Sequence, residues 1–415
     1  EHNDEDGNLT LNYVSREIEN KFRYENNARL GEYKIISGAG AEFAKYTNNT
    51  FQRVFIPRAD DTLTSIDYNS YLDFFKYNAF VQASRSFLAD KLTLSAGIRA
   101  DGASYSDETS NPLRQISPRA SFSYALSRKV SLNANMGRYF QLPSYTTLGY
   151  RDAAGDLVNK ANGIRYIRSD HLVAGVEFRR NTNARLSVEG FIKWYAHYPF
   201  SVNDSVSIAS KGANYGTYGD EPATPVSSGR AYGAELYYRD QLLDKVNVIL
   251  SYTLVRSEFQ DKNGRLIPSA WDNRHILNLS ASAGFDRNWN VGMKWRFVGG
   301  APYTPYDYNR SSLIEAWDAR GQGYLDFSRY NTERLGNFHQ LDLRIDKGYF
   351  FNKWSLDVYV DVQNLYNFQS KENGILLLHR DADGNPVIDP EDPTRYALKS
   401  ITTKSGTVLP TLGIV

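Results

Sequence analysis

One stretch near the end of the chain alternates apolar and polar residues almost without exception. It covers residues 354–368 and reads WSLDVYVDVQNLYNF. A period of two predicts a β-strand with one apolar and one polar face, and the aromatic residues at its end are typical of a membrane interface. The apolar positions of this strand are Trp354, Leu356, Val358, Val360 and Val362. Because a protein core and lipid would both accept that face, the rest of the chain has to decide between them.

The same alternation recurs along most of the chain. No segment longer than a turn or two shows a convincing helical period, so the pattern predicts an all-β protein. We predict about fifteen strands, near residues 10–27, 31–46, 70–88, 91–103, 118–127, 130–141, 166–181, 184–199, 229–240, 245–258, 275–285, 289–299, 339–351, 354–368 and 407–415.

The connections between the predicted strands alternate between short and long. The long connections fall near residues 47–69, 104–117, 142–165, 200–228, 259–274, 300–338 and 369–406. Transmembrane β-barrels place short turns on the periplasmic side and long loops outside the cell, whereas soluble β-folds follow no such rule. The pattern therefore predicts an antiparallel transmembrane β-barrel with these loops on the extracellular side, and it assigns the apolar face of residues 354–362 to outer-membrane lipid.

Composition agrees with this interpretation and narrows the partners. The mean hydropathy is −0.52 and no run of apolar residues is long enough for a helical membrane span, but β-barrels are hydrophilic overall because half of each strand faces a polar lumen. Aromatic residues make up 14% of the chain. The 48 basic and 47 acidic residues are mixed along the sequence, so nucleic acid is not a predicted partner.

Strand direction predicts where the two ends lie. The first strand leads into a short turn and the last follows a long loop, so both run toward the periplasm. The first residues would then lie in an extracellular loop, and Val415 would lie on the periplasmic side. An odd number of strands cannot close an antiparallel barrel of even strand number, so we expect an odd number of further strands upstream. A porin-sized barrel that lacks one strand is the competing count.

Several stretches resemble one family, the TonB-dependent outer-membrane receptors, and in particular the C-terminal part of their barrel. The resembling stretches are SPRASFSYALS (117–127), NMGRYFQLPSY (135–145), RSDHLVAGVEF (168–178), SSGRAYGAELYYRDQL (227–242), SAWDNRHILNLSASAGF (269–285), KWRFVGGAPYTPYD (294–307), VYVDVQNLYNF (358–368) and LPTLGIV (409–415). The resemblance implies a barrel of about 22 strands with a plugged lumen, and hence seven further strands.

The resemblance also implies a function and partners. It implies uptake of a scarce nutrient (siderophore-bound iron, a vitamin, an oligosaccharide or a peptide) bound by extracellular loops and energised by the TonB complex, in the outer membrane of a Gram-negative bacterium. The chain departs from the family because it lacks the plug domain, the TonB-contacting box and the early strands, and because it ends at Val415 without a terminal aromatic. We expect the plug and early strands on another chain, on a segment beyond this sequence, or cleaved away. A surface lipoprotein remains open as a further partner. The alternatives are a passive porin-like channel, a structural outer-membrane protein, or a soluble all-β protein.

The long connection near residues 300–338 is rich in aromatic residues and contains the candidate binding residues. Aromatic residues and arginine carry much of the energy at recognition sites, but a loop of this length could equally use aromatics as its own small core. The candidates are Tyr303, Tyr306, Tyr308, Trp317, Arg320, Tyr324 and Tyr330. Both interpretations stay open from sequence alone.

Two further sets of residues receive structural assignments. An interface girdle of aromatic residues is predicted at Trp194, Tyr195, Tyr198 and Phe200. Charged residues within strands are predicted to face the lumen, namely Arg99, Lys294, Arg296, Arg344, Asp342, Asp346, Asp357 and Asp361.

No catalytic residue, metal site or cofactor is predicted. The six histidines lack close metal-ligand spacing and the chain has no cysteine. No nucleophile-elbow pattern is present. The acidic stretch around Asp381 and Asp383 resembles a calcium loop but lacks its final bidentate glutamate, so we predict a hairpin tip there.

Overall fold

The computed structural model describes residues 2–3, 9–55, 63–152, 154–211, 220–242 and 245–415. They form one large antiparallel sheet of seventeen strands, of which β1 (His2–Asn3) and β12 (Leu266–Pro268) are short. The fifteen long strands are β2 (Leu9–Leu30), β3 (Tyr33–Phe55), β4 (Leu63–Phe87), β5 (Leu92–Ala103), β6 (Ile116–Ala125), β7 (Val130–Gln141), β8 (Ile167–Arg179), β9 (Arg185–Ser201), β10 (Ala223–Leu242), β11 (Val246–Gln260), β13 (Arg274–Phe285), β14 (Trp289–Val298), β17 (Phe338–Phe350), β18 (Ser355–Gln363) and β25 (Leu409–Ile414).

The remaining elements are short and belong to the connections. The helices are α1 (Asp107–Ser110), η1 (Pro112–Gln115), α2 (Tyr145–Leu148), α3 (Val158–Ala161), η2 (Ile208–Ser210), η3 (Asp286–Asn288), α4 (Tyr308–Ser312), α5 (Ile314–Arg320) and η4 (Phe327–Arg329). The small strands are β15 (Pro302–Tyr303), β16 (Glu333–Arg334), β19 (Ser370–Lys371), β20 (Ile375–Leu378), β21 (Ile388–Asp389), β22 (Asp392–Tyr396), β23 (Leu398–Ile401) and β24 (Lys404–Ser405). No helix within the described ranges is long and apolar enough to cross a membrane.

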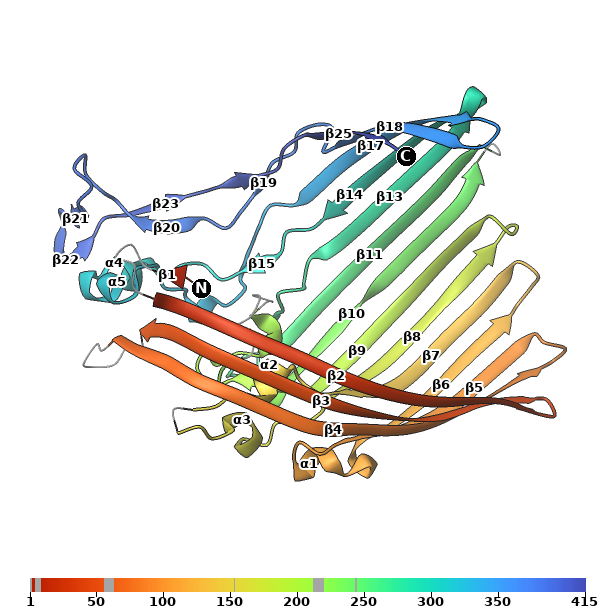
Figure 1. The fold of residues 1–415 in the computed structure, drawn as a ribbon, viewed down its shortest axis with the longest axis horizontal. Coiled ribbons are helices and arrows are strands. Elements are labelled where there is room, and N and C mark those ends of the chain that lie inside the picture. The colour runs from red at the N-terminus through yellow and green to blue at the C-terminus, as the bar shows by residue number, and fades with distance from the viewer. Residues whose placement is uncertain (1, 4–8, 56–62, 153, 212–219, 243–244) are drawn as a thin grey trace.

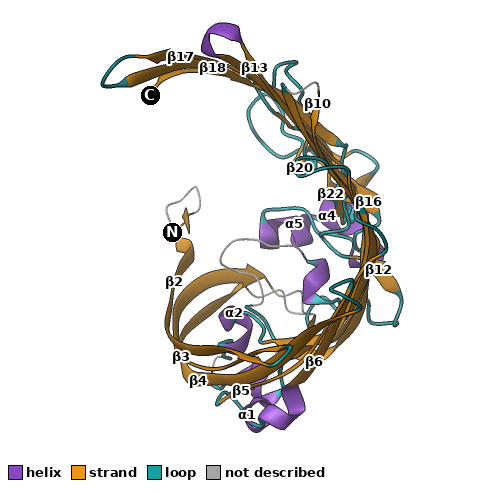
Figure 2. Cartoon of the chain, turned by 90° about the vertical axis from the view of Figure 1, so that its right-hand side faces the viewer, coloured by secondary structure: helices purple, strands orange, loops and turns teal. Residues whose placement is uncertain are grey.

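Neighbouring long strands in the sheet are also neighbours in the sequence (Figure 1). Each of the fifteen predicted strands overlaps one long strand, so the all-β antiparallel prediction is confirmed. The sheet curves into a wide arc that stays open between β2 and β25 (Figure 2). β18, which lies in the stretch with the clearest alternation, pairs with β17 on one side and with β25 on the other.

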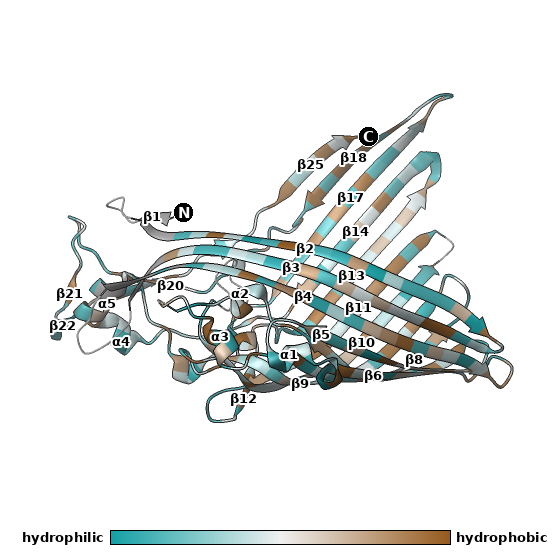
Figure 3. Cartoon of the chain, turned by 60° about the horizontal axis from the view of Figure 1, so that its bottom comes forward, coloured by the Kyte–Doolittle hydropathy of each residue, from teal (hydrophilic) through white to brown (hydrophobic). Residues whose placement is uncertain are grey.

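The strand register divides the sheet into two faces. Residues opposite each other in adjacent strands share a face, and successive residues alternate between faces. We call inner the face that carries Ala44 and Tyr46, because these residues pack against α2 inside the arc (Figure 2). The opposite face is the outer face. Figure 3 shows the resulting alternation of polar and apolar positions along the strands.

The register places both groups of strand residues that were assigned from the sequence. Every charged strand residue predicted to face the lumen lies on the inner face, as follows from the continuous pairing between β3 and β18. Leu356, Val358, Val360 and Val362 lie together on the outer face, and Trp354 precedes the strand with its ring stacked on Phe351 at 4.1 Å between centroids. Contact of this outer face with lipid stays a prediction.

One predicted loop is wrong in extent. Most of the loop expected near 47–69 is strand, because β3 continues to Phe55 and β4 begins at Leu63. The inner side chains Asn48 and Thr50 are 4% and 1% exposed, so this extension carries polar residues on a buried face. Thr50 donates a hydrogen bond to Asn48 at 2.8 Å. The predicted strand end depended on the alternation of apolar and polar residues. That alternation stops where polar residues occupy the buried face, so the strand was predicted too short.

The connections keep two different lengths at the two ends of the strands. At one end, β2 turns into β3 through two residues, and Gly31 in that turn has a φ of +59°, which glycine adopts without strain. At the other end, the connection 142–166 folds back inside the arc. Its Tyr145 and Leu148 complete an apolar cluster with inner-face residues of β3 and β4, including Tyr46 and Phe74. This cluster fixes the loop against the inner wall.

Candidate functional site

A groove lies between the two longest connections, residues 299–337 and 364–408. It has a volume of about 430 Å³ and is lined by Tyr303, Tyr306 and Tyr308 from the first connection and by Lys371 and Glu372 from the second. Glu333, Arg329 and Arg334 add charge to the same lining. Aromatic rings beside both positive and negative groups can bind a polar organic molecule by stacking and by hydrogen bonds.

Polar contacts hold the two walls of this groove together. The Arg395 guanidinium donates to the Asn309 carbonyl at 2.5 Å and to the Ser312 hydroxyl at 2.6 Å. The Tyr396 hydroxyl donates to Asp318 at 3.1 Å. Arg395 and Tyr396 thus tie the second connection to α4 and α5 of the first.

The structure separates the predicted binding residues into two groups. Tyr303, Tyr306 and Tyr308 line the groove, and Tyr308 is 53% exposed. Trp317 and Tyr330 are instead buried and do not line it, and the Tyr330 ring stacks on Phe327 at 5.8 Å between centroids. Tyr324 is buried with them. The side chain of Arg320 lies outside the described residues.

A buried acidic residue anchors the groove to the strands below it. Asp272 is fully buried and accepts hydrogen bonds from the Ser257 backbone amide at 2.8 Å and from the Arg256 guanidinium at 3.2 Å. The guanidinium of Arg334, which lines the groove, forms an ion pair with the same carboxylate and also donates to the Gly300 carbonyl at 3.0 Å. The position of Arg334 in the groove therefore depends on Asp272.

A second, larger hollow lies on the inner face under the connection 142–166. Its volume is about 750 Å³, and Tyr139, His171, Tyr195 and Tyr198 line it. The rings of Tyr139 and His171 are 4.5 Å apart, and the His171 ring is within 2.7 Å of the Ser169 hydroxyl. This combination of rings and hydrogen-bonding groups suits a ligand that passes along the inner wall.

This hollow was not predicted from the sequence, because two of its aromatic residues, Tyr195 and Tyr198, were assigned to an interface girdle. Trp194 fits that assignment by face, since it lies on the outer face and is 46% exposed. Tyr195 lies on the inner face, and the left-handed backbone at His197 (φ +60°) accompanies a register shift that brings Tyr198 to the hollow as well. The girdle prediction is therefore wrong for Tyr195 and Tyr198. A histidine with positive φ inside a strand leaves no signal in the alternation pattern.

A third hollow of about 480 Å³ is polar and lies beside the second. Its centre is Lys76, whose ammonium forms ion pairs with Glu19 at 3.0 Å and with Glu42. Lys76 also donates a hydrogen bond to the Tyr145 hydroxyl of α2 at 2.6 Å. These contacts tie the inward loop to the charged inner wall of β2, β3 and β4.

The acidic tip at residues 380–386 is a hairpin turn. The Asp381 carboxylate accepts from the backbone amides of Asp383 at 3.0 Å and Asn385 at 2.8 Å, and Gly384 has a φ of +86°. These are the contacts of an aspartate that stabilises a tight turn. They occupy an oxygen that a cation would otherwise require.

One carboxyl group in the connection 202–222 makes local stability depend on pH. Burial raises the pKa of Asp220 from 3.8 to about 7, and the neighbouring Glu221 carboxylate adds to the rise. One Asp220 carboxylate oxygen is buried without a hydrogen-bond partner among the described residues. A raised carboxyl pKa means that the folded loop holds a proton which the unfolded loop has lost, so stability falls as pH rises from about 4 to about 7 and levels off above.

We therefore expect amide hydrogen exchange in residues 202–211 and 220–222 to accelerate across that pH interval, after correction for the intrinsic rate. Asp220→Asn should remove the acceleration because its side chain stays neutral. An unchanged pH profile in Asp220→Asn would contradict the assignment.

Comparisons with known proteins agree with this architecture. Residues 2–365 match the family described as TonB dependent receptor-like, beta-barrel. Among solved structures, the chain is similar to the ferripyoverdine receptor of the outer membrane of Pseudomonas aeruginosa (TM-score 0.60, 16% identity, 88% of this chain and 46% of that chain). It is also similar to a copper transporter (TM-score 0.58, 16% identity, 87% and 52%) and to the ferric preacinetobactin receptor from Acinetobacter baumannii (TM-score 0.55, 12% identity, 98% and 55%).

At these identities the structural likeness shows the fold alone. The chain spans about half the length of those solved proteins. No curated protein matches it.

Proposed function

Because the chain belongs to the family of TonB-dependent receptor β-barrels, whose match covers residues 2–365, we propose that it is the barrel of an outer-membrane receptor for energised uptake of a scarce nutrient. The groove between residues 299–337 and 364–408 is the observation that carries this proposal. It presents three tyrosines and charges of both signs at the long-loop end of the strands, where a ligand from outside the cell arrives first.

The inner-face hollows provide the continuation of the route. A ligand released from the groove meets the 750 Å³ hollow around His171 and then the charged wall around Lys76. Small polar organic molecules and their metal chelates are compatible with both linings. The solved relatives named above bind or transport iron chelates and copper, which supports a metal chelate as the first substrate class to test.

The edges of the sheet at β2 and β25 support pairing with further strands of the same barrel. Among the described residues, β2 pairs only with β1 and β3, and β25 pairs only with β18. Unpaired backbone groups are not tolerated in lipid, so we propose that strands from another segment pair with both edges. That segment would also contain the plug and the contact to the TonB complex. A surface lipoprotein that covers the loops is compatible with the same arrangement.

Uptake by a strain that lacks the gene tests the proposal. We expect loss of growth on a limiting iron chelate or other nutrient, restored by the gene only when TonB is active. A passive channel would restore uptake regardless of TonB. Uptake that continues in a TonB mutant would therefore refute the energised mechanism.

Replacing Tyr308 tests the groove itself. Tyr308→Ala removes an exposed ring from the groove and should weaken nutrient binding by about 1–2 kcal/mol, or roughly tenfold in Kd. Binding to whole cells measures the effect. Trp271→Ala is the matched control, because Trp271 is an equally exposed aromatic residue (61%) of a neighbouring loop that does not line the groove. Equal binding by Tyr308→Ala and wild type would show that the groove is not the binding site.

A further inference from the structure

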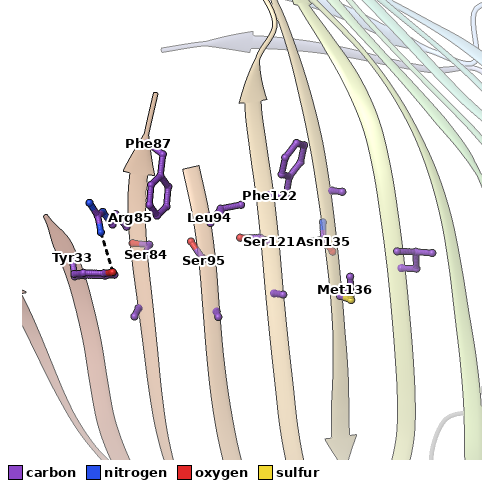
Figure 4. A pocket seen from close by; sticks show the side chains of 15 residues that line it. Tyr33, Ser84, Arg85, Phe87, Leu94, Ser95, Ser121, Phe122, Asn135 and Met136 are labelled. Atoms are coloured by element: carbon purple, nitrogen blue, oxygen red, sulfur yellow. Dashed lines mark hydrogen bonds between the residues drawn. The ribbon is translucent and has the colours of Figure 1, made fainter. Parts of the chain in front are cut away.

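The outer face of the sheet contains an apolar trough that has no part in the nutrient route. It crosses β4 to β8, has a volume of about 460 Å³ and lies on the side opposite to the hollows described above (Figure 4). This volume is within the range of a site for a small molecule or an acyl chain.

Small side chains in register create the floor of the trough. Ala83 lies opposite Ala96 in the next strand, and Ala96 lies opposite Ala120. Met136 follows Ala120 in the same row on β7 and Leu172 follows Met136 on β8, so these two side chains close the far end of the floor. Phe87, Leu94 and Phe122 stand on its short-turn side, and Ala134 lies opposite Phe122. Met136 is 59% exposed and Leu172 is 42% exposed.

A pair of opposite charges lies at one end of the trough. Arg85 lines it, donates a hydrogen bond to the Tyr33 hydroxyl at 3.1 Å and forms an ion pair with Glu32. Figure 4 shows Arg85 and Tyr33 side by side at this end. The Arg85 guanidinium also lies 4.7 Å from the centroid of the Phe87 ring. The side chain of Glu32 is 70% exposed, so it is accessible to a ligand.

The charge pair lies near the short turns, and this position indicates which part of the membrane surrounds the trough. Glu32 belongs to the short turn between β2 and β3, and Tyr33 and Arg85 directly adjoin the short-turn end of the strands. If the proposed function holds, the outer face contacts lipid and the short turns lie at the periplasmic surface of the membrane. The apolar trough then lies among acyl chains of the inner leaflet, and the charge pair lies at the level of the head groups.

We propose that the trough binds one phospholipid whose head group is phosphoethanolamine. One acyl chain lies on the alanine floor between Leu94 and Met136. The phosphate binds the guanidinium of Arg85, which has donors beyond those used by Tyr33 and Glu32. The ammonium group binds Glu32. A zwitterionic head group complements the two charges together, whereas a phosphoglycerol head group would bind Arg85 through its phosphate but has no cation for Glu32.

Native mass spectrometry of the purified full-length protein tests the proposal. The protein is exchanged into detergent and titrated with phosphatidylethanolamine or phosphatidylglycerol of the same acyl chains. We expect one ethanolamine lipid to be retained about threefold to fivefold more than the glycerol lipid, as two exposed charge contacts allow. Equal retention of the two lipids would overturn the proposal.

Three variants and one control variant separate the contributions of the acyl chain and the head group. Ala96→Phe places a ring on the trough floor and should abolish retention of the single bound phospholipid. The control variant Ala281→Phe, on the outer face of β13, should not. Arg85→Gln should reduce retention of both lipids. Glu32→Gln should remove only the preference for ethanolamine, and this change in an exposed turn leaves the strands intact. Ethanolamine preference that survives Glu32→Gln, or retention that survives Ala96→Phe, would refute the site.

The result is also distinguishable from failure of the proposed function. A membrane protein with normal uptake and no lipid preference would overturn only the lipid site. A protein recovered without detergent from the soluble fraction would overturn both.

Discussion

Val360→Arg is expected to hinder insertion of the barrel into the outer membrane, at a cost of about 2–4 kcal/mol if the residue lies near the middle of the bilayer. Val360 is on the outer face of β18, between Ile345 of β17 and Leu412 of β25, and it is 45% exposed. An arginine there would have to place its charge among acyl chains. Membrane fractionation and the heat-dependent gel mobility of folded barrels would measure the loss of inserted protein.

The adjacent residue is the matched control for this experiment. Asp361 lies on the inner face opposite Arg344, so Asp361→Asn should leave insertion nearly unchanged. The contrast between two consecutive positions tests the assignment of faces more sharply than either variant alone. Normal insertion of Val360→Arg would contradict the placement of this face in lipid.

The second large effect is expected at Asp272. Asp272→Ala leaves the guanidinium groups of Arg256 and Arg334 without their shared buried carboxylate, and breaking a buried ion pair from one side typically costs about 3–5 kcal/mol. The loss is expected locally, in residues 266–273 and 299–337, because these segments meet at Asp272. Hydrogen exchange of those segments measures it, and nutrient binding should weaken because Arg334 lines the groove.

An exposed ion pair in another loop supplies the comparison. Glu108 pairs with Arg114 at 2.6 Å with both side chains about half exposed, so Glu108→Ala should cost about 0–1 kcal/mol. If Asp272→Ala and Glu108→Ala changed exchange equally little, the buried carboxylate would not be an anchor of the groove.

The strands could be predicted from sequence because their signal is local. In β14, Val291, Met293 and Trp295 alternate with Gly292 and Lys294, and no distant contact is needed to assign the two faces. The prediction was wrong where burial depends on another part of the chain. Tyr46 is buried because Tyr145 and Leu148 of the connection 142–166 fold back against the inner wall beside it, and no residue near Tyr46 in the sequence signals this contact.

The candidate site was predictable only in part for a related reason. Aromatic enrichment indicated Tyr303, Tyr306 and Tyr308, which line the groove, but it gave the same weight to Trp317, which is buried and does not line it. Whether a loop aromatic faces a groove or a core depends on which other loop docks there. Here the second connection is held against the first by Arg395, which follows α5 by more than seventy positions in the sequence.

The two ends of the strands should tolerate insertions and deletions very differently. One residue added to the two-residue turn after Leu30 would shift β2 against β3, and because side chains alternate strictly, it would exchange the faces of every residue in one strand. Residues added at the tip of the hairpin 380–386 would leave all long-strand pairings unchanged. Such a scaffold can gain, lose or lengthen loops at the binding rim while the opposite rim stays fixed, so new ligand preferences can arise without renewed selection for the sheet.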